Sequence, residues 1–590
     1  MKFPKFLTGL KFLIGFTLGL ALLVLPLSQF RPEPLAPLQS LAVQIDGRKK
    51  PLDTVALETV QKLHGSANYR QADGSKLDYL QTYFALTFND RDWNNEPFLL
   101  FSYRPLKEEV GLNPEQKYFS FQELLSSKAL STVINRAHAR EIAGEDLVRL
   151  EREALSIEDR ATLLYRTVTD GSGALSLVPH PNDLKGTWVA IADATELYPP
   201  EAAANLMALD QQVQQGYRFG AAHLDYVGQL GGKLKQSLRE LSPAVYPSDA
   251  VLDREVFYNH FHPFGKAWMM FGLGFLVMLV SLWFKPLELY GSAIGLATAG
   301  LATEAYGFLL RMQIADRPPV TNMYESVIWV SFGVIALALI FELTSEKARY
   351  YLLSASPVAV VCLLLADRLP VVLDPSIAPL VPVLRDNFWL SIHVPTITLG
   401  YAAFALAMGL GHVSLGHYLF ANPANPTIKK RLQALSQFNY RTLQVGVLLL
   451  TTGVILGGIW AHFSWGRFWG WDPKETWALI ALLCYLVPLH GRLVGWIGNF
   501  GINAAAVVSF NAVLMAWYGV NFVLGTGLHS YGFGTGDSQL VVAAVVLADL
   551  SLVVLTVLRH RRRKPAAQPL IVEEVTLSEA AMKAMASDAQ

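Results

Sequence analysis

Ten runs of apolar residues constrain the fold of this chain more than any other feature of its sequence. They lie at roughly 12–28, 266–284, 287–310, 325–343, 351–366, 393–420, 443–461, 476–490, 501–524 and 538–558. A helix needs about 20 mostly apolar residues to cross the hydrocarbon core of a membrane. Charged residues make up only 16% of the 590 residues, against about 25% in soluble domains. The sequence therefore predicts an all-α polytopic membrane protein with about ten transmembrane helices.

The composition divides the chain into four parts. Residues 1–30 hold the first apolar run behind Lys2, Lys5 and Lys11, and because no small-x-small cleavage site follows it, we expect an uncleaved N-terminal membrane anchor rather than a signal peptide. Residues 31–262 are mixed and charged and predict one extracytoplasmic domain inserted between the first and second spans. Residues 263–560 hold the other spans, and 561–590 are expected to form a solvated cytoplasmic tail.

The distribution of basic residues predicts the orientation of these spans. Cytoplasmic loops carry an excess of Lys and Arg, so both termini are expected in the cytoplasm, and the loops near 311–324, 367–392, 461–475 and 525–537 are expected outside. The expected inner residues are Lys285, Lys347, Arg349, Lys429, Lys430, Arg431, Arg441, Arg492, Arg559, Arg561, Arg562, Arg563 and Lys564. Basic residues that stand in the outer loops against this trend suggest anion binding: Arg311, Arg317, Arg368, Arg385, Arg467 and Lys474.

Several classes of function are disfavoured by what the sequence lacks. Lys+Arg and Asp+Glu both number 48, so no net positive field favours nucleic acid. Cys362 and Cys484 lie far apart in apolar runs without a CxxC, which disfavours a disulfide scaffold, a zinc site or a thiol relay within the chain. No P-loop or GxGxxG supports an ATP-driven pump or a dinucleotide enzyme.

The segment 460–477 carries five tryptophans in eighteen residues. An aromatic belt at the membrane interface would account for one or two of them. Gly466 and Gly470 accompany them, and glycine allows a flat ligand to approach the backbone while indole rings offer stacking faces. We therefore favour a binding platform for an aromatic macrocycle, formed by Trp465, Trp469 and Trp471, over a belt.

Residues 472–475 have the pattern of a helix start. Asp472 at the N-cap, Pro473 at the first helical position and Glu475 three residues after the cap predict a helix that begins here. A helix N-terminus carries partial positive charge, and with Arg467 and Lys474 beside it the site suits carboxylates such as haem propionates. The structural and the binding interpretations are compatible.

The segment 465–477, Trp-Gly-Arg-Phe-Trp-Gly-Trp-Asp-Pro-Lys-Glu-Thr-Trp, followed by Tyr-Leu-Val-Pro-Leu-His-Gly-Arg at 485–492, resembles the tryptophan-rich signature of the CcsA (ResC) family of cytochrome c biogenesis proteins. Looser versions occur in CcmC and CcmF. Pro-Pro-Val-Thr-Asn-Met-Tyr-Glu-Ser at 318–326 resembles another CcsA stretch, and the resemblance covers roughly 264–560. Gly-Arg-Lys-Lys-Pro-Leu-Asp-Thr at 47–54 resembles part of the CcsB-like portion of fused forms, so domain 31–262 is expected to be at least partly CcsB-like.

The resemblance assigns roles to three of the thirteen histidines. It implies that His393 and His529 are the two outer axial ligands of haem iron, and that His490 is one of two intramembrane histidines that accept haem on its way outward. The spans at 12–28 and 266–284 contain no second intramembrane histidine. A separate CcsB/ResB-like subunit is expected to supply it, or another residue of this chain, with His412 and His417 as candidates at a similar depth.

The function implied by the resemblance is cytochrome c maturation in a bacterial plasma (inner) membrane, with a thylakoid membrane as the weaker alternative. Haem b, held by the histidines as substrate, would be presented to the CxxCH cysteines of an apocytochrome c, which makes the protein a cytochrome c haem lyase (synthase) or its haem-presenting subunit. Further partners implied are thiol-reducing proteins and the lipid bilayer. Two alternatives stay open: a haem transporter or chaperone that serves a separate lyase, and a scaffold whose tryptophans only bind protein.

Overall fold

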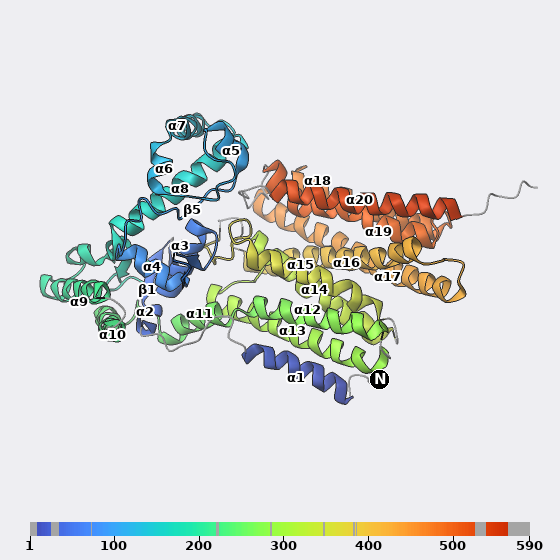
Figure 1. The fold of residues 1–590 in the computed structure, drawn as a ribbon, viewed down its shortest axis with the longest axis horizontal. Coiled ribbons are helices and arrows are strands. Elements are labelled where there is room, and N and C mark those ends of the chain that lie inside the picture. The colour runs from blue at the N-terminus through green and yellow to red at the C-terminus, as the bar shows by residue number, and fades with distance from the viewer. Residues whose placement is uncertain are drawn as a thin grey trace, which may run out of the picture.

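The membrane part of the protein is a bundle of long apolar helices with a separate domain at one end (Figure 1). The computed structural model describes residues 9–24, 35–45, 47–71, 73–219, 223–283, 286–345, 349–380, 384, 386–525 and 538–563. Within these ranges nine helices are long and apolar enough to cross a membrane, and Leu10–Val24 is a shorter apolar helix. This confirms the prediction of an all-α polytopic membrane protein.

The bundle consists of α1 (Leu10–Val24), α12 (Pro263–Trp283), α13 (Pro286–Ala315), α14 (Met323–Thr344), α15 (Tyr350–Arg368), α16 (Asn387–Phe420), α17 (Pro426–Trp465), α18 (Pro473–Leu493), α19 (Asn499–Leu514) and α20 (Ser538–Arg563). The helix α19 continues directly into a π-helical segment, η5 (Met515–Leu524). Each apolar run predicted from the sequence falls on one of these helices.

Consecutive membrane helices alternate in direction, so their connections alternate between the two ends of the bundle. The described connecting residues 316–322, 369–380 and 466–472 share the end that faces the separate domain. The described start of α1 and the end of α20 lie at the opposite end (Figure 1). Arg349, Arg441, Arg492 and Arg563 belong to the half of the bundle far from the separate domain, as expected if that half faces the cytoplasm.

Small residues let α1 approach α13 closely. A Cβ atom at Gly15 would lie 2.1 Å from the carbonyl oxygen of Ser292, and one at Gly295 would lie 2.4 Å from that of Phe12. The Ser292 hydroxyl also donates to the Lys11 carbonyl (2.9 Å). Packing through small residues is the usual way for membrane helices to associate. The helix α1 is therefore an integral part of the bundle.

The separate domain, named the outer domain below after its predicted side of the membrane, combines a small sheet with surrounding helices. Its antiparallel sheet has the order β2-β1-β7-β8, with Ala42 opposite Pro51 and Ile45 opposite Arg48. The strands are β1 (Ala42–Ile45), β2 (Arg48–Pro51), β3 (Tyr69–Arg70), β4 (Lys76–Leu77), β5 (Leu99–Leu100), β6 (Tyr118–Phe119), β7 (Ser176–Val178) and β8 (Val189–Ala190). The α-helices are α2 (Ala36–Gln39), α3 (Leu52–His64), α4 (Tyr79–Thr87), α5 (Arg104–Glu109), α6 (Phe121–Ser126), α7 (Lys128–Ile142), α8 (Arg149–Thr169), α9 (Pro200–Arg218), α10 (Leu224–Leu241) and α11 (Asp249–Phe261), with 3-10 helices η1 (Gly171–Ala174) and η2 (Ile191–Glu196).

The segment 47–54 binds the outer domain to α11, the helix that leads into the membrane bundle. Arg48 binds the Glu255 carboxylate of α11 through both terminal nitrogens (2.8 and 2.5 Å). The Thr54 hydroxyl donates to the same carboxylate (2.9 Å), and the Asn259 amide donates to the buried Asp53 (2.9 Å). Because α11 leads into α12 across His262, this network fixes how the domain sits over the bundle.

Candidate functional site

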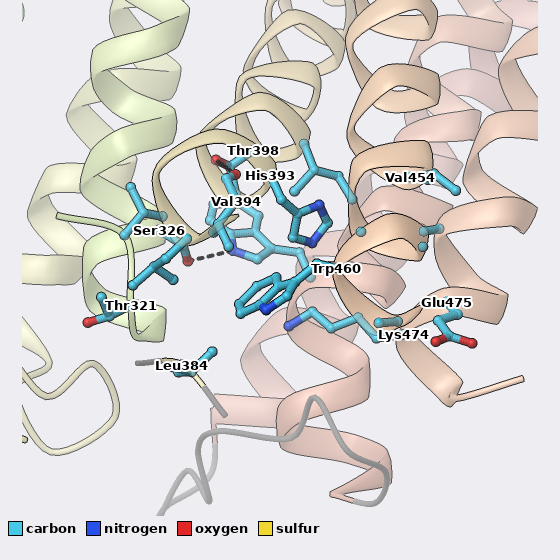
Figure 2. Close-up of a pocket in the computed structure, with 18 of the residues that line it drawn as sticks. Thr321, Ser326, Leu384, His393, Val394, Thr398, Val454, Trp460, Lys474 and Glu475 are labelled. Atoms are coloured by element: carbon cyan, nitrogen blue, oxygen red, sulfur yellow. Dashed lines mark hydrogen bonds between the residues drawn. The ribbon is translucent and has the colours of Figure 1, made fainter. Parts of the chain in front are cut away.

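A cavity opens at the end of the bundle that faces the separate domain, where five segments of the membrane part meet. Its walls come from the start of α14, the start of α16, the end of α17, the start of α18 and η5. Figure 2 shows His393, Trp460 and Lys474 converging on this space. The tryptophan-rich segment and the segment 318–326, which lie far apart in the sequence, therefore contribute to one site.

His393 is held on α16 in a defined orientation. Its Nδ1 lies 2.8 Å from the Gly453 carbonyl of α17, which can only accept, so Nδ1 carries the proton and the lone pair is on Nε2. The edge of the ring faces Trp460, with 5.8 Å between centroids. A Cβ atom at Gly457 would lie 2.5 Å from Cε1 of His393, so glycine is required there to admit the ring. A neutral imidazole fixed by its far nitrogen has the form that binds metal ions.

The tryptophans of the segment 460–477 are not equivalent. Trp460, Trp465 and Trp469 line the cavity. Trp471 instead is 70% exposed and makes an edge contact with Trp469 (5.8 Å). Its φ of 58° places a bulky residue in the left-handed region, a strained conformation that tends to occur at functional sites. Of the three predicted platform residues, Trp465 and Trp469 thus line the cavity and Trp471 lies outside it.

Gly466 and Gly470 each have a local structural reason. Gly466 follows the last residue of α17 and has φ of 69°, a conformation that favours glycine. Its N–H donates to the backbone carbonyl of His462 (2.9 Å). A Cβ atom at Gly470 would lie 1.8 Å from Nη1 of Arg467. A ligand contact at either glycine stays a prediction.

The helix start predicted at 472–475 is confirmed, and α18 begins at Pro473. The Asp472 carboxylate accepts from the Lys474 N–H (2.9 Å), while Glu475 accepts from the N–H groups of Gly470 (2.8 Å) and Asp472 (3.2 Å). This capping box fixes the loop between α17 and α18. The Lys474 side chain extends into the cavity beside Trp460, whereas the Glu475 carboxylate points toward the loop (Figure 2).

The segment 318–326 forms the wall opposite the tryptophans. Asn322 caps α14 by accepting from the Glu325 N–H (2.8 Å). The Ser326 hydroxyl accepts from the indole N–H of Trp517 in η5 (2.8 Å), the dashed contact in Figure 2. Trp517 and Asn521 line the cavity, but sequence reasoning missed them because nothing in the sequence marks a π-helical turn. Such turns are frequent at functional sites.

The structure assigns protein partners to three of the outer basic residues. Arg311 is buried and pairs with the buried Glu325 (2.7 Å), Arg317 donates to the Ala378 carbonyl (2.6 Å), and Arg368 pairs with Asp367 (3.2 Å). Arg385 lies outside the described residues. Arg467 is exposed on the loop, and Lys474 reaches the cavity. The expected anion-binding role therefore narrows to Lys474, with Arg467 at the periphery.

The other histidines expected to act on haem are not in this cavity. His529 lies outside the described residues, in a segment bounded by Gly525 at the end of η5 and Ser538 at the start of α20. His490 is exposed near the inner end of α18, where its Nδ1 donates to the Leu486 carbonyl (2.8 Å). His417 makes the same kind of contact to Val413 (2.8 Å).

His412 uses both ring nitrogens within the protein. Nδ1 contacts the Met408 carbonyl (2.9 Å), and Nε2 contacts the Asp549 carboxylate of α20 (2.5 Å). Ligation of iron would require the His412–Asp549 contact to break. This disfavours His412, and leaves His417 as the candidate of this pair for a second intramembrane ligand.

Known proteins match the same part of the chain. Residues 320–529 match the family model described as Cytochrome C assembly protein, so the match runs from the segment 318–326 through the cavity-lining helices to His529. The chain is 36% identical over 238 residues to the cytochrome c biogenesis protein CcsA of Guillardia theta, covering 36% of this chain and 77% of that protein. It is 34% identical over 308 residues to CcsA of a Synechococcus strain, covering 46% and 98%.

A longer relative extends the similarity into the outer domain. The chain is 30% identical over 505 residues to Protein NrfI of Wolinella succinogenes, covering 83% of this chain and 53% of NrfI. The chain thus spans about half the length of that relative. An alignment of this extent must include much of the outer domain as well as the membrane bundle.

Proposed function

The chain belongs to the CcsA family of cytochrome c biogenesis proteins, and on that premise we propose that it binds haem in the outer cavity and presents it for thioether attachment to the CxxCH segment of an apocytochrome c. The observation that carries the proposal is the orientation of His393. Its Nδ1 donates to the Gly453 carbonyl, so Nε2 is the ring nitrogen that carries the lone pair by which imidazole ligates iron, and the ring lines a cavity formed in part by indole rings.

Each wall of the cavity has a role in holding haem. Trp460, Trp465 and Trp469 supply aromatic faces and edges for the porphyrin. Lys474 and the N-terminus of α18 supply positive charge for the propionates. Because propionates and vinyl groups lie on opposite sides of haem, anchoring the propionates at Lys474 directs the vinyl edge away from α18.

His529 is proposed as the second axial ligand. It follows η5, whose residues Trp517 and Asn521 line the cavity, by a few positions in the sequence. Ligation by two imidazoles holds the iron tightly and shapes its potential. The catalytic contribution of the protein is then chiefly to position haem against the apocytochrome thiols.

The bond-forming step needs no further reactant. Each cysteine sulfur of the apocytochrome bonds to the inner carbon of a vinyl group, and the hydrogen of that thiol goes to the outer carbon, so nothing is released. The chain itself is not expected to supply a thiol, because neither the buried Cys362 nor the half-buried Cys484 lines the cavity. The thiols must arrive reduced, which is the reason to expect thiol-reducing partners.

The remaining roles follow from the predicted topology. We place the bundle in a bacterial inner membrane with both termini in the cytoplasm. His490, near the inner end of α18, accepts haem before it moves outward, and the second intramembrane ligand comes from His417 or from a CcsB/ResB-like subunit. The outer domain, 31–262, recruits or shields the apocytochrome, since its segment 47–54 holds it over the bundle.

The test is an absorption spectrum with a pyridine haemochrome assay on the purified full chain. We expect non-covalent haem with a low-spin bis-histidine spectrum that His393→Ala and His529→Ala weaken or abolish. His462→Ala is the matched control, since His462 lies two residues after Trp460 near the end of α17 but does not line the cavity. A haem-free native protein, or haem unchanged in both ligand variants, would contradict the proposal.

A second experiment separates the lyase from a haem transporter or chaperone. The chain is expressed with an apocytochrome c in a host that lacks other cytochrome c maturation genes. A lyase yields cytochrome with covalently bound haem, whereas a transporter yields haem-loaded chain and unmodified apocytochrome. His393→Ala serves as the inactive control in the same host.

A further inference from the structure

Three glutamates are buried in helices α13 and α14 of the membrane bundle, and two of them have evident structural partners. Glu325 pairs with Arg311 and accepts from Thr321 (2.8 and 2.6 Å). Glu342 accepts from the Tyr290 hydroxyl (2.7 Å) and from the N–H groups of Arg349 (2.9 Å) and Leu352 (3.1 Å). The third, Glu304, is 0% exposed, and among the residues that the structure describes neither of its carboxyl oxygens has a hydrogen-bond partner.

Two further polar groups that are buried without a hydrogen-bond partner in the described part of the chain lie at the level of Glu304. Pro263 packs at Gly307 and Phe271 packs at Gly300, so Trp268 of α12 lies opposite the turn of α13 that holds Glu304. Within the described part of the chain, the indole N–H of Trp268 and the hydroxyl of Ser331 in α14 are also buried without a hydrogen-bond partner. The Ser331 hydroxyl lies near the Glu304 carboxyl, outside hydrogen-bonding geometry.

No positive charge compensates Glu304 among the described residues. The groups that act on its carboxyl are Ser331 of α14 and, at longer range, the Cys362 thiol of α15. Lys266 of α12 is engaged elsewhere, because its ammonium donates to the Leu23 carbonyl of α1 (2.7 Å). A carboxylate in such surroundings is strongly disfavoured, and the group takes up a proton instead.

We propose that Glu304 is an intramembrane proton-binding site, which holds its proton as a neutral carboxylic acid and shares one buried water molecule with Ser331 and Trp268. The acid O–H and the indole N–H are donors, and the acid carbonyl is an acceptor, while the serine hydroxyl can be either. A water molecule that joins three such groups satisfies them all. Glu304 and Trp268 lie outside the matched range 320–529, and the site is independent of haem binding in the outer cavity.

The first test is chemical labelling of the full chain in lipid nanodiscs with N,N′-dicyclohexylcarbodiimide, which adds to protonated carboxyl groups in apolar surroundings. We expect mass spectrometry to find the adduct on Glu304 and not on Glu325, whose carboxylate is paired with the guanidinium of Arg311. Mapping on the wild-type chain requires no variant to fold. Labelling of Glu304 only after unfolding would overturn the proposal.

The second test is infrared spectroscopy of the same samples. One component of the carbonyl stretch of protonated carboxyl groups, identified by its shift in D2O, is expected in the wild type and in Glu342→Gln and is expected to be lost in Glu304→Gln. Trp268→Phe and Ser331→Ala are each expected to shift its frequency, because each removes a partner of the shared water. A carbonyl band unchanged by Glu304→Gln would overturn the site, and a Glu304 component unmoved by both neighbouring substitutions would overturn the shared water.

Haem content measured in parallel keeps this inference separate from the proposed function. Glu304→Gln is expected to retain the haem of the wild type. An absent carbonyl band with normal haem content contradicts the proton site alone, whereas a normal band with no haem contradicts the haem-presenting function alone.

Discussion

The Nδ1 atom of His393 lies 2.8 Å from the carbonyl oxygen of Gly453, so the orientation of the imidazole on α16 is set by the backbone of α17. No side-chain substitution removes that carbonyl. A larger residue at Gly457, on the next turn of α17, would however displace the His393 ring. Because His393 fits against Gly457, the ligand geometry depends on the absence of a single methyl group.

Gly457→Ala tests this dependence. The new Cβ atom would lie 2.5 Å from Cε1 of His393, so the ring must move. We expect haem content to fall about tenfold, equivalent to about 1.4 kcal/mol, as measured by pyridine haemochrome. Gly416→Ala in α16 is the matched control, since a Cβ atom there meets nothing within 4 Å. Equal haem content in the two variants would show that His393 is not the ligand.

Lys474 and Arg467 are expected to differ in their effect on haem binding. Lys474 lines the cavity and Arg467 does not. Lys474→Ala should therefore lower haem content by several fold, Lys474→Arg should restore most of it, and Arg467→Ala alone should have little effect. The double variant should behave like Lys474→Ala. Undiminished haem and cytochrome yield in the double variant would remove the propionate-anchoring role.

The buried Arg311–Glu325 pair is expected to be necessary as a pair. Loss of one partner leaves an uncompensated buried charge, which costs about 3–5 kcal/mol. Arg311→Met or Glu325→Leu alone should thus lower the unfolding temperature markedly, as followed by tryptophan fluorescence in detergent. The double variant should recover most of the loss. A double variant no more stable than either single one would indicate that the hydrogen bonds to Tyr258 and Thr321 matter more than the charges.

The contact between α1 and α13 predicts sensitivity to size at Gly15. A methyl group there would lie 2.1 Å from the Ser292 carbonyl oxygen, and backbone cannot yield as a side chain can. Overpacking of this kind costs about 1–3 kcal/mol, so Gly15→Ala should lower the unfolding temperature. Leu18→Ala, at a position that is 44% exposed on the same helix, should not. Equal stability of the two variants would contradict the tight packing of α1.

Two histidines of the outer domain predict opposite dependences of stability on pH. Burial lowers the pKa of His64, which stacks between Phe98 and Tyr118, and the Glu158 carboxylate raises the pKa of the exposed His138. His64 therefore contributes stability above its unfolded pKa of about 6.5, and this is lost as pH falls. The contribution of His138 is present below that pKa and is lost as pH rises.

Unfolding of the full chain between about pH 5 and 8 checks these signs. Relative to wild type, His64→Gln should flatten the loss of stability at acidic pH, and His138→Gln should flatten the loss at higher pH. Slopes of the same sign for the two histidines would contradict the assignment of their environments.

Local patterns in the sequence predicted the membrane helices and the start of α18, because apolar length and helix caps depend on neighbouring residues. The capping box at Asp472 and Glu475 is an example. Contacts between distant residues were not predictable in this way. Trp517 reaches Ser326 across 191 positions, and His412 reaches Asp549 across 137. The tryptophan cluster indicated one wall of the cavity from the sequence alone. No local sequence pattern indicated the wall formed by the π-helical segment η5.

The π-helical segment η5 makes the cavity sensitive to the insertion or deletion of a single residue. A turn of π-helix contains about one residue more than a turn of α-helix. The segment η5 therefore corresponds to a regular α-helix with an extra residue inserted. Deleting one residue between 515 and 520 would restore α-helical register and rotate the residues on one side of the deletion relative to those on the other by about 100°. The cavity-lining residues of η5 and the packing of the preceding α19 could not then both be kept, although length and hydropathy would hardly change. We therefore expect a one-residue insertion or deletion in this stretch to disturb the cavity wall more than its small effect on composition would suggest.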